Sequence, residues 1–152
     1  MNTTDGEQRE LLPEWLEEHG IAARPRAVAR ARRVREALRE LLIANNEARR
    51  PSGAAAVTLE LAATRAELTL RFPSAELVPR AAGLDGLLGS LLTIAFDGVR
   101  DGTWSRLKAC RNCHWAFYDE SRNRSASWCS MQLCGNRLKT KAYRRRRAAR
   151  SG

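Results

Sequence analysis

Four cysteines in the last third of the chain are the residues best suited to specific chemistry. They form two close pairs, Cys110-x2-Cys113 and Cys129-x4-Cys134, with fifteen residues between the pairs, and the chain contains no other cysteine. Two close pairs separated by a short segment are typical of a tetrahedral zinc site. Because four thiolates leave no open coordination position, we expect one structural Zn²⁺ ion rather than a catalytic one.

Other interpretations of the cysteines are weaker. Disulfides are rare in a reducing compartment, and unligated cysteines seldom fall into two pairs flanked by aromatic residues. His114, beside Cys113, could replace a cysteine as a ligand, but four thiols are available, and we interpret it as a surface residue. The first ten residues are polar and acidic, unlike a signal peptide, and no apolar run reaches the roughly 18 residues that cross a bilayer. We therefore expect a cytoplasmic protein with no membrane partner.

Positive charge is concentrated in and after the cysteine segment. Residues 1–109 contain 16 Lys+Arg and 15 Asp+Glu, a net charge of +1, whereas residues 110–152 contain 11 and 2, a net charge of +9. Such asymmetry favours a polyanionic partner for the C-terminal part. We expect nucleic acid, with double-stranded DNA preferred.

The basic residues would form a surface if the chain after the cysteines is helical. Counted from Asn136 as a helix, Arg137, Lys141 and Arg144 form a row at i, i+4 and i+7, which could lie along or in a DNA groove. The alternative is a solvated, partly disordered basic tail. The predicted nucleic-acid contacts are Arg122, Arg124, Asn136, Arg137, Lys139, Lys141, Arg144, Arg145 and Arg146.

Two groups of residues near the cysteines have a structural interpretation that we prefer. Asn136 and Arg137 would read base edges only if they face outward, and we favour a capping role for Asn136 near the metal. Six of the nine aromatic residues fall between Trp104 and Tyr143. Stacking on bases is one use for them, but packing under a small finger is the preferred one.

The residues between the cysteine pairs predict a β-hairpin. Trp115-Ala116-Phe117-Tyr118 is strand-like, Asp119 to Ser127 is turn-like, and Trp128 follows. The second cysteine pair would then lie at or near the start of the C-terminal helix. A knuckle, a hairpin and a helix in this order describe a treble-clef-like zinc finger.

Apolar periodicity predicts four helices before the cysteines. The apolar stripe of the second helix is Val28, Ala31, Val34, Leu38, Leu41 and Leu42, and that of the fourth is Leu84, Leu88, Leu91, Leu92, Ala95 and Val99. The third helix competes with a strand, because Val57, Leu59 and Leu61 also alternate, and we favour the helix. The predicted helices span residues 10–19, 25–45, 51–65 and 83–100.

A short hairpin is predicted between the third and fourth helices. Residues 67–72 alternate as a half-buried strand, Pro73-Ser74 turns the chain, and residues 76–78 return as a partner strand. The expected fold is therefore mainly α with a small β-hairpin (α+β) in an N-terminal domain, residues 1–102. A treble-clef-like zinc finger with a basic C-terminal helix, residues 103–152, would follow.

The C-terminal sequence resembles a known family. Trp104 to Cys110, Trp115 to Asp119, Ser121-Arg122-Asn123, Trp128 to Met131 and Cys134-Gly135-Asn136-Arg137 together resemble the CGNR zinc finger, which is named after the last four residues. The resemblance implies that Cys110, Cys113, Cys129 and Cys134 bind the zinc and that the finger binds DNA. The N-terminal part, through its helix order, Asn45-Asn46 and the sequence from Asp101 to Trp104, resembles the ABATE domain of bacterial proteins described as stress-induced transcription regulators.

These observations predict a bacterial transcription regulator that uses a structural zinc site to hold a basic helix on DNA. The alternatives are a protein-interaction or RNA-binding adaptor, which exposed aromatic residues would favour, and a zinc-thiolate redox switch. We expect no enzyme, because the only histidines are His19 and His114 and no catalytic motif is present. A homodimer would match a two-fold operator. No residue of the N-terminal domain identifies a small-molecule effector.

Overall fold

The computed structural model describes residues 10–136 and Thr140. Four α-helices dominate it, with two short antiparallel strand pairs, a 3-10 turn and a π-helical turn. The elements in chain order are α1 (Leu12–Glu18), α2 (Pro25–Glu47), α3 (Gly53–Arg65), β1 (Thr69–Arg71), β2 (Glu76–Val78), α4 (Gly83–Arg100), η1 (Thr103–Arg106), β3 (Leu107–Ala109), β4 (Ala116–Tyr118) and η2 (Met131–Gly135). Residues 10–102, called the helical part below, thus contain the four helices and the first strand pair, as predicted.

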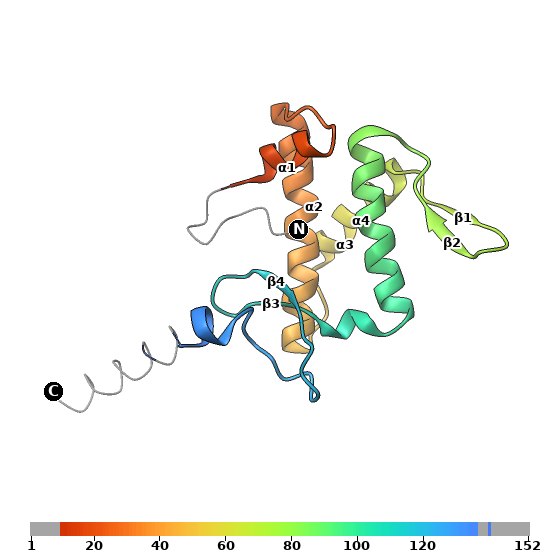
Figure 1. Cartoon of the computed structure of the whole chain (residues 1–152). Helices are drawn as coiled ribbons and strands as arrows, with labels where there is room; N and C mark the ends of the chain where they lie inside the picture. The colour runs from red at the N-terminus through yellow and green to blue at the C-terminus, as the bar shows by residue number, and fades with distance from the viewer. Residues whose placement is uncertain (1–9, 137–139, 141–152) are drawn as a thin grey trace.

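The long helix α2 is the central element of the fold. Pro25 occupies its first turn, where a missing N–H does no harm, and Arg24 before it is extended. The helix runs past the predicted end at Asn45, because Ala48, in the left-handed conformation, ends it by donating its N–H to the carbonyl of Ala44. Figure 1 shows α2 between α1 and α4, with β3 and β4 beside its C-terminal end.

The segment that could have been a strand is the helix α3. The Ser52 hydroxyl caps it by accepting a hydrogen bond from the Ala55 N–H at 3.3 Å. The strand-like alternation of Val57 and Leu61 does not put them inside, since they are 54% and 56% exposed. Small residues instead form the packed face, because Ala55 and Ala62 are buried.

One hydrophobic core holds the helical part together. Its residues come from α1, α2, α3 and α4, and the predicted stripe of α2 supplies three of them. The core contains Leu12, Leu16, Ala31, Val34, Leu38, Ala62, Leu88 and Leu92. Since none of them comes from the cysteine segment, the helical part can bury its apolar residues without the finger.

The first strand pair is less buried than predicted. Residues 69–71 pair with residues 76–78 in the expected hairpin, and residues 72–75 form the turn. The expectation of a half-buried strand was wrong, because all three residues of β1 are exposed and Phe72 is 75% exposed. The physical reason is that β1 and β2 project from the helices, and it is β2 that contacts α4 (Figure 1).

Helix α4 has the predicted bounds, Gly83–Arg100. Leu88 and Leu92 are buried as expected, but Val99 is 61% exposed, so the predicted stripe ends before the last turn. Gly89 allows a close approach between α4 and its neighbours, since a Cβ atom there would lie 2.6 Å from Ala66 Cβ and 2.8 Å from Pro79 Cβ. Within the described part of the chain, no helix has both the length and the apolar character needed to cross a membrane.

Candidate metal centre

The first cysteine pair lies in the connection between β3 and β4. The strands are antiparallel, with Leu107 opposite Tyr118 and Ala109 opposite Ala116. At the connection, the Cys110 N–H donates to the Trp115 carbonyl at 2.8 Å, and the His114 N–H donates to the Cys110 carbonyl at 2.9 Å. This tight turn directs two cysteine side chains to the same side.

The predicted hairpin between the cysteine pairs was therefore wrong in its pairing. The strand at Ala116–Tyr118 exists, but its partner is Leu107–Ala109, before the first pair, and not the segment around Trp128. The turn at the first cysteine pair brings residues 107–109 directly back alongside residues 116–118. The described residues 119–130 contain no strand.

A helical turn positions the second cysteine pair. Ser130 caps η2, with its hydroxyl accepting a hydrogen bond from the Leu133 N–H at 3.3 Å, and its carbonyl accepts the Cys134 N–H at 3.0 Å. Cys129 precedes this cap, and Cys134 lies one turn later, so the four-residue spacing is spanned by the turn. Gly135 packs closely against Met131 of the same turn, where a Cβ atom at position 135 would lie only 2.6 Å from Met131 Sδ.

The four cysteine sulfurs converge on one point. Cys113 Sγ lies 3.7 Å from Cys129 Sγ and 3.6 Å from Cys134 Sγ, and Cys129 Sγ lies 3.7 Å from Cys134 Sγ. With Cys110, all four sulfurs are within 4.8 Å of one another. A tetrahedron of sulfurs about 2.3 Å from zinc has sulfur–sulfur edges of about 3.8 Å, whereas a disulfide bond is about 2.05 Å. The cluster therefore fits one zinc ion, and all four thiols are free.

The electrostatics of the cluster also favour a cation. Burial raises the pKa of Cys110, but backbone N–H groups of Cys113, Cys129 and Asn112 outweigh burial and lower that pKa to about 7. Burial and the neighbouring sulfurs raise the pKa of Cys129. Thiols this close cannot all ionise beside one another unless a positive ion compensates the charge. The Asn112 side chain adds an N–H···S contact of 3.5 Å to Cys134.

A buried ion pair supports the segment between the cysteine pairs. Lys108 Nζ lies 2.6 Å from Asp119 Oδ2, and the Asp119 side chain is fully buried. The same carboxylate accepts the N–H groups of Ser121 at 2.9 Å and Ala126 at 3.0 Å. Burial raises the pKa of Asp119, but these partners outweigh it and hold the pKa well below the usual range. The ion pair thus ties β3 to the loop that leads to Cys129.

This supporting pair was missed in the sequence. Lys108 stands in a three-residue strand, where a lysine is usually exposed, and Asp119 was interpreted as the start of a turn. The signal that could have found it is charge, because Asp119 and Glu120 are the only acidic residues after residue 109. An acidic residue that persists in so basic a segment is a candidate for a specific ion pair.

Two asparagines of α2 hold the finger against the helical part. Asn45 Nδ2 donates to the Trp104 carbonyl at 2.9 Å and to the Leu107 carbonyl at 3.3 Å. Asn46 Nδ2 donates to the Ala109 carbonyl at 2.5 Å. The predicted helix ended at residue 45, but both asparagines lie within α2 and bind the backbone of η1 and β3, just before the first cysteine pair.

Three of the nine predicted nucleic-acid contacts lie within the described residues. Arg122 and Arg124 lie in the loop after β4 and are exposed, and Arg124 Nη1 donates to the Ser105 hydroxyl at 3.0 Å. Asn136 is exposed at the end of η2, where its backbone N–H donates to the Met131 carbonyl. The predicted contacts outside the described residues are Arg137, Lys139, Lys141, Arg144, Arg145 and Arg146.

Aromatic side chains of the finger are more exposed than expected. Trp115 is 37% exposed and Tyr118 is 46% exposed, so the expectation that the aromatic residues pack under the finger fails for these two. Trp104, Phe117 and Trp128 are half-buried. His114 is exposed, in agreement with its interpretation as a surface residue.

Comparison with known families identifies the segment that contains the cysteine cluster. Residues 106–147 match the CGNR zinc finger. The matched range contains all four cysteines, so the resemblance drawn from their sequence context is confirmed for this segment. No curated protein matches the chain. Together, the sulfur geometry and the family match support one structural zinc ion. When bound, this ion would cross-link the two cysteine pairs.

Proposed function

We propose that this protein is a zinc-finger DNA-binding transcription regulator, in which the zinc site holds a basic segment, residues 137–150, against duplex DNA. The observation that carries the proposal is the position of the cysteine cluster. Cys134 lies in η2, three residues before the basic segment in the sequence, so a zinc ion bound there would anchor the chain directly before that segment. We assign the ligands as Cys110, Cys113, Cys129 and Cys134.

Charge supports a polyanionic partner. The net charge of +9 on residues 110–152 contrasts with +1 on the rest of the chain. Arg111, Arg122 and Arg124 are exposed on the finger and would add phosphate contacts to those of the basic segment. Residues 110–152 contain two acidic residues, Asp119 and Glu120, and Asp119 is buried and paired with Lys108, so little negative charge opposes the approach of a phosphate backbone.

The zinc has a structural role in this proposal. Four sulfur ligands fill a tetrahedral site and leave no position for a water molecule or a substrate. The chain itself contributes the capped turn at Ser130, the Lys108–Asp119 ion pair and the asparagine contacts from α2, which position the segments that carry the cysteines. We propose no enzymatic reaction.

Single-stranded RNA is the second candidate partner, and one observation favours it. Trp115, beside the first cysteine pair, and Tyr118, at the other end of β4, are exposed and could stack on unpaired bases. Duplex DNA stays the first candidate, because phosphate contacts from a basic segment do not require unpaired bases.

Binding across a salt series tests the proposal. The zinc-loaded protein is titrated with random-sequence duplex DNA and with single-stranded RNA of equal length between about 50 and 200 mM salt. We expect micromolar duplex binding with a steep salt dependence. Tighter binding to RNA would favour single-stranded RNA as the partner. No binding to either nucleic acid would contradict both candidate functions.

A matched pair of triple variants locates the contacts. Replacing Arg137, Lys141 and Arg144 with Gln should reduce the salt slope by about 3 if all three contact phosphate. The control replaces three exposed arginines of the helical part with Gln, and it changes the net charge equally. These control residues are Arg26, Arg50 and Arg71. An equal loss in both variants would contradict a DNA surface on the basic segment.

A further inference from the structure

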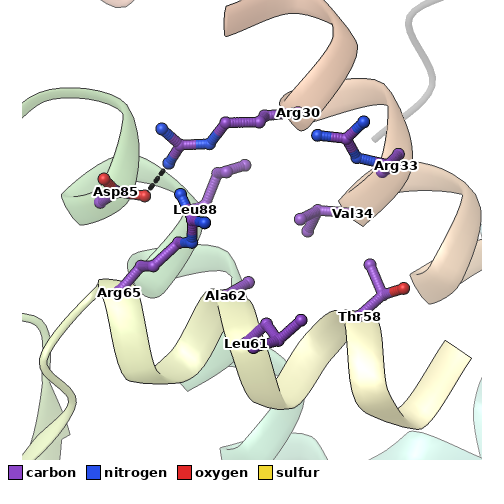
Figure 2. A pocket seen from close by; sticks show the side chains of 9 residues that line it. All are labelled: Arg30, Arg33, Val34, Thr58, Leu61, Ala62, Arg65, Asp85 and Leu88. Atoms are coloured by element: carbon purple, nitrogen blue, oxygen red, sulfur yellow. Dashed lines mark hydrogen bonds and ion pairs between the residues drawn. The ribbon is translucent and has the colours of Figure 1, made fainter. Parts of the chain in front are cut away.

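A pocket of about 400 Å³ lies among α2, α3 and α4. All of its lining residues belong to the helical part, so it is a different site from the cysteine cluster. Figure 2 shows Arg30 and Arg33 reaching into it from α2 and Arg65 from α3, with Asp85 of α4 at one side. Its volume is in the range of cavities that hold small organic ligands.

The wall of the pocket carries unbalanced positive charge. Arg30 forms an ion pair with Asp85, but Arg33 and Arg65 form no ion pair with any residue that the structure describes. The three guanidinium groups and one carboxylate leave a net charge of +2. Burial lowers the pKa of Arg30, and the charges of Arg65 and Arg33 lower it further, so the three cations repel one another.

The floor of the same pocket is apolar. Val34, Ala62 and Leu88 are members of the hydrophobic core, and they form part of its lining. Leu61 also lines the pocket and is 56% exposed. An apolar floor under a cationic wall matches a ligand that has an apolar body and one anionic group.

We propose that this pocket binds a small organic anion, in which a carboxylate or phosphate contacts Arg33 and Arg65 and an apolar group packs on Val34, Ala62 and Leu88. Arginine suits this role, because its planar guanidinium donates two parallel hydrogen bonds to either group. The bound anion would also offset the repulsion among the three arginines. The inference goes beyond the proposed DNA binding and does not depend on it.

The test uses the full-length, zinc-loaded protein and five probes, with binding measured by calorimetry and by NMR of the Ala62 and Leu88 methyl groups. The probes are 2-naphthoate, 2-naphthyl phosphate, the uncharged 2-naphthamide, acetate and inorganic phosphate. We expect 2-naphthoate or 2-naphthyl phosphate to bind at least tenfold more tightly than the other three, and to shift both methyl signals. The tighter of the two identifies the anionic group.

Equal binding of 2-naphthamide would overturn the role of charge, and equal binding of acetate or inorganic phosphate would overturn the role of the apolar floor.

Variants localise the site. Arg33→Gln and Arg65→Gln should each weaken binding of the preferred naphthyl probe about tenfold, as expected for loss of a charge-assisted hydrogen bond. Both arginines are exposed and lack an ion pair among the described residues, so the variants should fold. The control is Arg26→Gln, two turns before Arg33 on α2 and outside the pocket, which should leave binding unchanged. An equal loss in the control, or no binding of either anionic naphthyl probe, would overturn the proposal.

Discussion

Two groups of interacting side chains organise the C-terminal region at the level of single residues. The four cysteine sulfurs, all within 4.8 Å of one another, form one group, and the buried Lys108–Asp119 pair forms the other. The cysteines could be predicted because their spacing alone indicates shared coordination. The ion pair was missed, since its partners are eleven residues apart and meet only after β3 and β4 have paired.

The Lys108–Asp119 pair gives the first prediction. Lys108→Met should lower the free energy of unfolding of the zinc-loaded finger by about 3 kcal/mol, because it leaves a buried carboxylate without its cation. Denaturant unfolding followed by NMR signals of residues 107–127 measures this loss. The control is Arg122→Met in the exposed loop, expected to change stability by less than about 0.5 kcal/mol. A similarly small effect of Lys108→Met would show that the pair does not stabilise the finger.

At the level of elements, periodicity predicted the four helices and the β1–β2 pairing, but it gave the wrong partner for Ala116–Tyr118. The bounds of α4 agree with the predicted range, because its apolar stripe and its flanking glycines are local signals. The partner of Ala116–Tyr118 depends on the three-dimensional turn at Cys110 and Cys113, which alternation does not encode. The same limit explains why the contacts of Asn45 and Asn46 were not predicted, because their hydrogen bonds to η1 and β3 join residues about sixty positions apart.

The packing of α4 gives a prediction at this scale. Gly89→Ala should destabilise the helical part by about 1–3 kcal/mol, because the added Cβ atom would press against Ala66 and Pro79. Thermal unfolding followed by circular dichroism measures the change. Gly98→Ala on the same helix is the matched control, since its Cβ atom would meet its nearest neighbour, Thr103 Oγ1, at an ordinary 3.4 Å. We expect the control to be neutral or stabilising, and an equal loss in both variants would rule out the close approach as the cause.

At the level of the whole molecule, α2 joins two units that are stabilised differently. Its middle contributes Ala31, Val34 and Leu38 to the core, and its C-terminal end binds the finger through asparagine side chains. The helical part buries apolar side chains, whereas a finger this small depends on its metal for much of its folding free energy. We therefore propose two units with a boundary near residue 102. Resemblance of the first unit to the ABATE domain stays a prediction.

This division predicts the behaviour of a ligand variant. Cys129→Ala should lower the zinc content and remove the dispersed NMR signals of residues 107–136, while the methyl signals of Leu38 and Leu88 persist. Gln132→Ala, at an exposed position of η2, should leave zinc content and signals unchanged. Unchanged zinc content in Cys129→Ala would contradict the ligand assignment. Loss of the core signals would contradict two separately stabilised units.

The proposed regulator depends on one zinc ion held by four sulfurs. Zinc X-ray absorption spectroscopy of the purified protein, with metal analysis of the same sample, measures this directly. We predict one zinc per chain and four sulfur ligands at about 2.3 Å. Nitrogen or oxygen among the zinc ligands, or less than one zinc per chain, would contradict the four-cysteine site.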